Sequence, residues 1–234
     1  NDAKLMEFHQ LCRQMNIVAG PDEMLRPLNV GLLFFNEDPP RFFPQTQIDV
    51  VRFPEGPGGD VFTEKIFKGP LNRMIKDALA YINSILIEEI VIKQRGRPEA
   101  ERFFNYPYEA LEEALVNAVY HRSYEIREPV EVRILPDVVT IASYPGPDRS
   151  IDLEDLRNGR GVTRRYRNRR IGEFLKELNL TEGRGTGIPK ILRAIRKNGS
   201  PPPSFETDAD RTYFVARFPI HPKALQRLAK DDIA

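Results

Sequence analysis

Apolar residues recur at helical spacing in two segments of the first half of the chain. Residues 2–15 are followed by a Gly-Pro stop, and residues 70–86 show the more regular apolar stripe. Apolar side chains three and four positions apart line one face of a helix, so each segment is a predicted helix.

Shorter apolar runs in the same half indicate strands. Residues 47–53 alternate as a half-buried strand does, and further strands are expected at 61–67 and 88–93. The run at 27–35 is too short for periodicity alone to separate helix from strand. A polar stretch with Gly and Pro at 94–101 indicates a boundary after residue 97.

The second half predicts a larger mixed domain. A helix with proline at its start is expected at 107–122, and strands at 130–135 and 138–142 follow in hairpin fashion. Beyond them we expect a loop, two helices, a strand and a charged tail, at 143–163, 171–178, 188–197, 212–218 and 223–234.

The expected fold class is α+β, in two parts. A connecting α+β subdomain of helices on a small sheet occupies residues 1–97. An α/β sandwich occupies residues 98–222, with the helices at 107–122 and 188–197 on one face of a mixed sheet.

The composition is that of an ordinary globular protein. Of 234 residues, 41% are hydrophobic and 29% are charged, which excludes a disordered or fibrous chain. A formal net charge of +1 means that contact with nucleic acid would need a local basic patch. One cysteine and three scattered histidines exclude an internal disulfide and a zinc centre with paired ligands.

The sequence contains neither a signal peptide nor an apolar run of the roughly 18 residues that cross a membrane. It begins at Asn1 and not at a methionine. We therefore expect a fragment of a cytoplasmic protein with no membrane partner.

Three polar residues lie four positions apart on the helix expected at 107–122. Glu113, Asn117 and His121 form a stripe beside the apolar one. An asparagine oxygen can bind Mg²⁺ and a glutamate can accept a proton from an attacking water, so the spacing suits a magnesium–nucleotide site. The alternative is the solvated face of an amphipathic helix.

A glycine-rich turn precedes the helix expected at 188–197. Gly183, Gly185 and Gly187 alternate with other residues, which lets a phosphate approach the backbone beside a helix N-terminus. Thr186 fits as an N-cap or as a hydroxyl donor to phosphate. A flexible loop is the alternative. The turn is not a Walker A loop, because no Lys-Ser/Thr follows it, and no βαβ unit surrounds it.

Four motifs occur in the order typical of one protein family. They are EALVNAVYHRSY at 113–124, Pro-Gly at 145–146, Arg-Asn at 167–168 and GRGTGI at 183–188. By them the second half resembles the C-terminal domain of regulators labelled RecG-related helicases, a divergent branch of the histidine-kinase-like (GHKL) ATPases. LNVGLLFFNEDPPRFFP at 28–44, IDVVRF at 48–53 and KGPLNRMI at 68–75 resemble the region that follows an AlbA-like (Schlafen-type) DNA-binding domain in those proteins. This likeness favours a helix at 28–35.

The resemblance implies a nucleotide site with one weakened end. By it, Glu113 is the general base, Asn117 binds Mg²⁺ with the nucleotide, His121 is a further contact, and the glycines at 183–187 hold phosphate. Active members have Asp-x-Gly-x-Gly at the adenine, where this chain has Ser-Tyr-Pro-Gly-Pro and only Gly146 has a counterpart. The lost hydrogen bond costs roughly 1–3 kcal/mol, so ATP is expected to bind with little base selectivity and to be hydrolysed weakly if at all.

Arginines crowd the segment before the helix expected at 171–178. They are Arg160, Arg164, Arg165, Arg167, Arg169 and Arg170, with Tyr166 among them. One interpretation is contact with DNA phosphates. A second is a solvated loop paired with the carboxylates just upstream. The resemblance adds a third, an arginine of the nucleotide lid.

Three hypotheses of function follow. The leading one is a transcriptional regulator, in which an upstream DNA-binding domain responds to nucleotide-induced ordering of residues 147–182. The others are a Mg-ATPase that uses Glu113 as its base, and a non-catalytic scaffold that forms a homodimer. A helicase motor is excluded because the chain contains no GxxxxGK[ST] loop.

Overall fold

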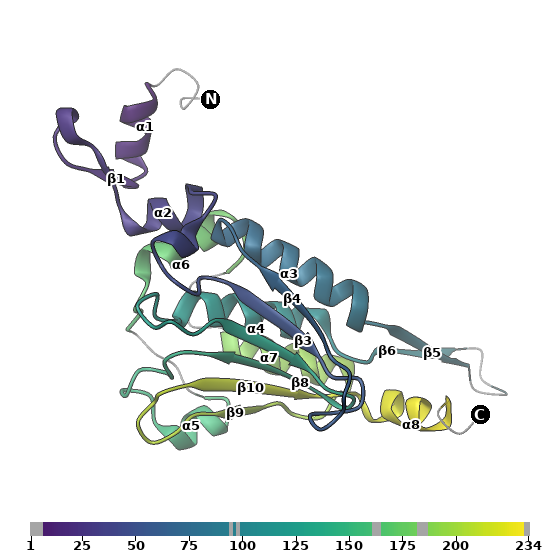
Figure 1. The fold of residues 1–234 in the computed structure, drawn as a ribbon. Coiled ribbons are helices and arrows are strands. Elements are labelled where there is room, and N and C mark those ends of the chain that lie inside the picture. Colours follow the sequence, from purple (N-terminus) through teal and green to yellow (C-terminus); the bar gives the residue numbers. More distant parts are fainter. Residues whose placement is uncertain (1–6, 94–95, 97–98, 161–164, 182–186, 232–234) are drawn as a thin grey trace.

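A mixed six-stranded sheet forms the centre of the molecule (Figure 1). The computed structural model describes residues 7–231 apart from 94–95, 97–98, 161–164 and 182–186. The strands lie in the order β4-β3-β7-β8-β10-β9. Only β3 and β7 are parallel neighbours in this sheet. In that spatial order the strands span Thr63–Phe67, Ile48–Arg52, Val130–Ile134, Val138–Ser143, Phe214–Pro219 and Ser204–Glu206.

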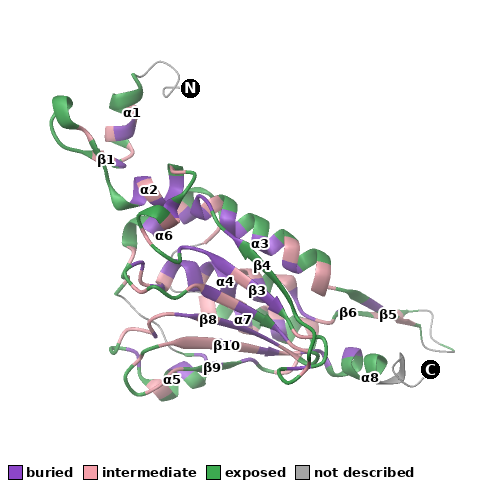
Figure 2. Ribbon diagram, viewed as in Figure 1, coloured by how far each residue is buried: buried purple, intermediate pink, exposed green. Residues whose placement is uncertain are grey.

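Three helices cover one face of this sheet (Figure 1). α4 (Tyr108–His121) lies between α3 (Leu71–Leu86) and α7 (Gly187–Asn198) and packs against both of them and against β8. Figure 2 shows that α4 is buried along most of its length, whereas α3 is buried along one face only. The helices and the inner face of the sheet share one continuous core. The predicted α+β fold, with a helix layer on a mixed sheet, is confirmed.

Two smaller units flank the sandwich at opposite ends (Figure 1). At one end lie α1, the β1–β2 ribbon, α2 and α6, which span Phe8–Gln14, Val18–Ala19 with Arg26–Pro27, Asn29–Phe35 and Arg169–Glu177. At the other end the β5–β6 ribbon lies beside α8, and these span Glu89–Lys93 with Ala100–Phe104 and Pro222–Asp231. Short 3-10 turns at Asp22–Met24 and Pro39–Arg41 and the short helix α5 (Leu153–Arg157) complete the described elements.

Most predicted helices and strands are found close to their expected places, and the ambiguous run at 27–35 contains the helix α2. The β1–β2 ribbon, β6, α5, β9 and α8 were not predicted. The expected charged tail at 223–234 is helical over most of its length, because α8 occupies residues 222–231.

The prediction of a separate small sheet within residues 1–97 is also wrong. β3 pairs in parallel with β7, with Ile48 opposite Val130 and Arg52 opposite Ile134, so β3 and β4 extend the main sheet. Ile48 and Val50 are fully buried in the core that the second half also lines. An alternating strand needs a second layer over its apolar face, and here α3 and α4 supply it. The sheet therefore crosses the expected boundary after residue 97.

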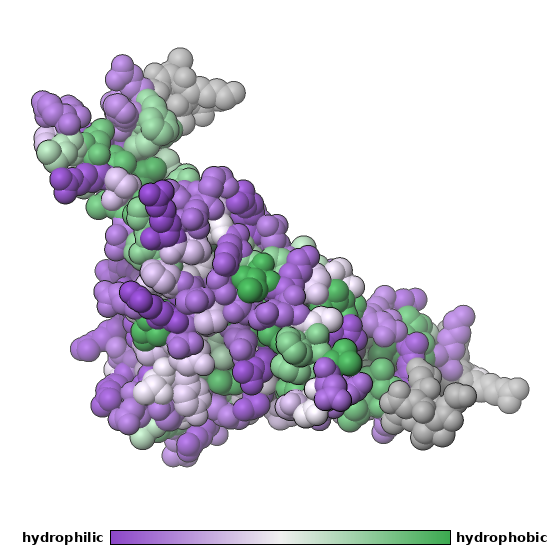
Figure 3. All heavy atoms as spheres, viewed as in Figure 1, coloured by the Kyte–Doolittle hydropathy of each residue, from purple (hydrophilic) through white to green (hydrophobic). Residues whose placement is uncertain are grey.

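The surface is mixed in character. The side seen in Figure 3 is mostly hydrophilic, with apolar side chains scattered among the charged ones. Among the described residues, no helix combines the length and the apolar character needed to cross a membrane.

Candidate functional site

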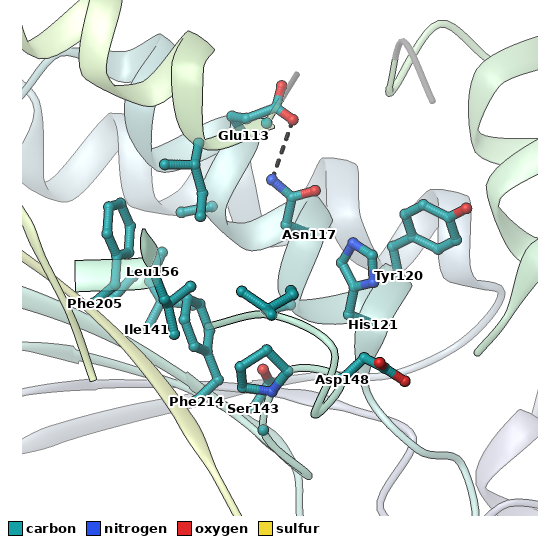
Figure 4. A pocket seen from close by; sticks show the side chains of 18 of the residues that line it. Glu113, Asn117, Tyr120, His121, Ile141, Ser143, Asp148, Leu156, Phe205 and Phe214 are labelled. Atoms are coloured by element: carbon teal, nitrogen blue, oxygen red, sulfur yellow. Dashed lines mark hydrogen bonds between the residues drawn. The ribbon is translucent and has the colours of Figure 1, made fainter. Parts of the chain in front are cut away.

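The polar stripe predicted on α4 exists, and its first two members touch. Glu113 is only 5% exposed, and the Nδ2 of Asn117 donates a hydrogen bond to its Oε1 at 3.1 Å (Figure 4). The carbonyl oxygen of Asn117 points away from Glu113 (Figure 4). An amide oxygen of this kind is a suitable ligand for a hard cation such as Mg²⁺.

A lysine that the sequence did not place in the site completes this cluster. The Nζ of Lys190, in the first turn of α7, lies 3.0 Å from Oε2 of Glu113. Burial raises the pKa of the neighbouring Glu112, and the charge of Lys190 opposes this shift. Nothing in the spacing of the chain reveals this pairing, because it depends on how α7 packs against α4.

Gly187 allows α7 to begin directly beside this cluster. A Cβ at this position would lie 2.5 Å from Nδ2 of Asn117 and 3.0 Å from Oε1 of Glu113. The first backbone N–H groups of a helix have no partner within the helix and favour anions. The last glycine of the predicted phosphate turn therefore lies beside Glu113 and Asn117. Gly183, Gly185 and Thr186 lie outside the described residues.

A cavity of about 370 Å³ opens next to these residues. Side chains of α4, α5, α7, β8, β9 and β10 line it together with the loop after β8 (Figure 4). One end holds Glu113, Asn117 and Gly187. The other end is apolar, and its lining includes Ile141, Ile151, Leu156, Phe205, Phe214 and Ala216. Most of the lining is apolar with a few polar groups at one end, as in small-molecule sites.

The floor of the apolar end is set by strand register. Ser143 and Ile141 of β8 share a face of the strand and pair with Phe214 and Ala216 of β10. All four line the cavity. Ser143 is 4% exposed, and its side chain makes no hydrogen bond to another described residue. It is therefore a lone hydroxyl in an apolar floor.

Gly146 shapes the loop above this floor. Its N–H donates to the carbonyl of Arg211 at 2.7 Å, and a Cβ would lie 2.6 Å from both Thr207 Oγ1 and the carbonyl of Tyr213. Glycine is required because the loop after β8 passes so close to the loop between β9 and β10. Gly146 lines the cavity, and its own N–H is already bonded to that loop.

Aromatic rings form the mouth of the cavity. His121 stacks on Tyr120 with ring centroids 4.5 Å apart, and Tyr166 stacks on Tyr120 at 5.7 Å. Burial, and then the charge of Arg167, lower the pKa of His121 from 6.5 to about 4. His121 is thus neutral at physiological pH, where it presents a ring and no charge to a ligand.

The described arginines of the basic run divide between two places. Arg165 and Arg167 line the cavity mouth, where Arg167 also donates to the carbonyl of His121. Arg169 and Arg170 belong to α6, and Arg170 pairs with Glu173. Arg160 lies elsewhere and pairs with Asp155 at 3.4 Å, in agreement with the predicted pairing to upstream carboxylates. Arg164 lies outside the described residues.

Asp148 faces the two arginines at the mouth. Hydrogen bonds from Ser150, and then the charges of Arg165 and Arg167, lower the pKa of Asp148. The charges of both arginines therefore act on Asp148, which lines the same cavity. Among the described residues, no three His, Cys, Asp or Glu side chains gather as a metal site, so a cation here would need ligand oxygens in addition to Asn117.

Residues 128–218 match the family model described as "Putative ATP-dependent DNA helicase recG C-terminal". The second half of the chain is thus similar to the ATPase-like C-terminal domain of RecG-related proteins. The matched range contains Ser143, Phe214 and Gly187, whereas Glu113 and Asn117 on α4 precede it. The structure, and not the family match, brings these two groups together.

The fold has a counterpart among solved structures. The DIP2311 protein from Corynebacterium diphtheriae is similar with a TM-score of 0.68 and 20% sequence identity, over 94% of this chain and 42% of that one. At this identity the likeness shows the fold. The chain spans less than half the length of that protein. No curated protein matches the chain.

Proposed function

We propose that the cavity binds a nucleoside triphosphate with Mg²⁺ and that the chain is the nucleotide-responsive part of a DNA-acting transcriptional regulator. One observation supports the binding site above all. A single cavity joins the first turn of α7 and the side chain of Asn117 to an apolar slot. Phosphates and a base need these two environments in one site.

The polar end suits the phosphates. The start of α7 offers backbone N–H groups beside Gly187, Lys190 supplies a cation near Glu113, and Arg165 and Arg167 stand at the mouth. Asn117 would hold Mg²⁺ through its carbonyl oxygen, and the ion would supply charge neutralisation for the phosphates.

Hydrolysis is the second candidate, and the buried carboxylate of Glu113 favours it. That carboxylate already accepts a hydrogen bond from Asn117 and pairs with Lys190. A general base must have a free lone pair directed at water. Since the Nζ of Lys190 lies against Oε2 of Glu113, we expect hydrolysis to be slow unless a bound nucleotide draws Lys190 away.

The regulatory part of the proposal rests on α6, which begins at the cavity mouth. Asn168, its N-cap, donates to the carbonyls of Tyr120 at 2.8 Å and Arg122 at 2.7 Å. Gly172 lies against the ring of Tyr120, where a Cβ would come within 2.2 Å of the hydroxyl. A ligand that moves Tyr120 or the segment at 165–168 would therefore move α6.

The same helix contacts the N-terminal unit. Arg170 donates to the carbonyl of Met15 at 2.8 Å, and Phe174 stacks on Phe34 with centroids 5.0 Å apart. α6 thus lies between the cavity and the segments to which a preceding DNA-binding domain would be joined. These contacts of α6 form a physical route between the cavity and the N-terminal unit. Only a measured coupling between the two establishes that the route is used.

Calorimetric titration with Mg-ATP tests the binding proposal. The wild type and Asn83→Ala, an exposed asparagine on α3, should bind alike. Asn117→Ala should weaken Mg-ATP binding about tenfold and reduce the dependence of affinity on Mg²⁺. If the wild type does not bind Mg-ATP, only the scaffold hypothesis remains.

Hydrogen exchange tests the regulatory proposal. Saturating Mg-ATP should slow amide exchange in α6 and in the segment 13–18 relative to the apo protein, because Asn168 joins α6 to α4 and Arg170 joins α6 to Met15. In the full-length protein, Mg-ATP should also change the affinity for duplex DNA at fixed salt. Unchanged exchange in α6 with nucleotide bound would remove the regulatory role and leave a simple binding module.

A further inference from the structure

The lone hydroxyl of Ser143 lies in the apolar end of the cavity. Its floor consists of the cross-strand pairs Ile141–Ala216 and Ser143–Phe214. The facing helix α4 contributes Ala114 and Ala118, whose small side chains leave room above the floor. Figure 4 shows Ser143 and Phe214 among the lining residues, on the opposite side of the cavity from Glu113 and Asn117.

Two other polar groups near this slot already take part in hydrogen bonds. The N–H of Gly146 donates to Arg211, and the amide nitrogen of Asn117 donates to Glu113. Thr140 belongs to the opposite face of β8, since side chains alternate along a strand. Ser143 is therefore the group of the floor that can form a new hydrogen bond to an edge of a ring.

We propose that Ser143 contacts the base and that the slot accepts purine nucleotides without distinguishing adenine from guanine. This inference rests on the proposed nucleotide site. A hydroxyl donates one hydrogen bond and accepts others, so it can pair with the 6-amino group of adenine or with the 6-oxo group of guanine. A carboxylate only accepts and would select the amino group. Purines are favoured over pyrimidines because the larger ring buries more apolar surface against Ile141 and Phe214.

Calorimetric titration with Mg-ATP, Mg-GTP and Mg-CTP tests this proposal. The wild type should bind ATP and GTP within about threefold of each other, and CTP more weakly. Ser143→Ala should weaken ATP and GTP equally, by about threefold to tenfold, since one neutral hydrogen bond is lost in each case. Ser84→Ala, an exposed serine on α3, is the matched control and should change neither affinity.

Ser143→Asp gives the sharpest readout. A carboxylate in the floor should accept a hydrogen bond from the amino group of adenine and repel the oxygen of guanine, so ATP should be preferred over GTP by at least about tenfold. Circular dichroism and thermal unfolding check that this variant folds, and Ser143→Ala decides the question if it does not.

The outcomes separate this proposal from the one on which it depends. If the wild type binds ATP at least tenfold more tightly than GTP, or if Ser143→Ala binds both as the wild type does, the role of Ser143 is wrong and the nucleotide site stands. Absence of binding to every nucleotide would overturn the site itself and this inference with it.

Discussion

The two ends of the cavity differ in the interactions that hold their side chains in place. At the polar end, Glu113 lies between Asn117 and Lys190, and Gly187 fits against both Glu113 and Asn117. At the apolar end, Ser143 is a single hydroxyl among rings and aliphatic side chains. The polar end is thus a network of hydrogen bonds and an ion pair, whereas the apolar end is a surface of packed side chains.

This difference predicts different tolerances. A buried polar network has fixed distances and leaves an unsatisfied group when one member is changed, which is costly in a low-dielectric site. An apolar wall loses only the contacts of the atoms that are removed. Substitutions at the polar end should therefore weaken binding about tenfold or more, whereas conservative ones at the apolar end should weaken it less.

The largest effect is expected from Gly187→Ala. The added methyl would displace the side chains of Asn117 and Glu113 and obstruct the start of α7. Because the methyl would fill the phosphate end of the proposed site, Mg-ATP binding should weaken by about 100-fold in calorimetry. Gly58→Ala is the matched control, because a Cβ there meets nothing within 4 Å. Equal affinity in the two variants would show that the polar end is not a rigid network.

The stability of the protein should depend on pH through His121, at the mouth of the cavity. The folded pKa of His121 is lowered from 6.5 to about 4, so below pH 6.5 the unfolded chain takes up a proton that the folded chain does not. His121 thus contributes stability that is fully present above pH 6.5 and is lost as the pH falls toward 4.

Denaturant unfolding at pH 7 and pH 5 measures this loss. Between these two values the wild type should lose about 2 kcal/mol more than His121→Phe, which keeps a ring on Tyr120 but cannot be protonated. The difference between the two proteins cancels the contribution of His221, whose pKa burial also lowers. A pH dependence that is the same in both proteins would show that His121 is freely solvated.

The ion pair at the polar end should be stronger than an exposed one. Lys190→Met leaves the carboxylate of Glu113 buried with only Asn117 as a partner and should destabilise the fold. Adding Glu113→Gln should recover part of that loss, which gives a coupling of about 1–2 kcal/mol in a double-mutant cycle of unfolding. The exposed pair Lys223–Glu101 is the control, and its cycle should give less than about 0.5–1 kcal/mol. Equal couplings would contradict the view that burial sets the polar end apart.

The polar end was predictable where its residues share one helix. Glu113 and Asn117 are four positions apart, so helical geometry alone places them together. Gly187 was predictable from the glycine spacing. Lys190 was not, because its distance to Glu113 depends on the packing of α7 on α4, which no local pattern encodes.

The apolar end was hardly predictable at all. The partner of Ser143 is set by the register of β8 and β10, whose paired residues are about seventy positions apart in the chain. β9 has three residues and one buried side chain, Phe205, too little for a period-two pattern. The parallel pairing of β3 with β7 escaped prediction for the same reason, since it joins two strands across an expected domain boundary.

The smallest effect is expected at the apolar end, from Phe214→Leu. Leucine removes part of the ring that faces Ile141 and Ser143 but leaves no polar group without a partner. Mg-ATP and Mg-GTP should both bind about twofold to fourfold more weakly in calorimetry, in proportion to the lost apolar contact. Phe104→Leu, on the outlying β5–β6 ribbon, should leave both affinities unchanged. A loss as large as that of Gly187→Ala would mean that the ring fixes the position of the nucleotide as strictly as the polar network does, and the contrast between the two ends would then fail.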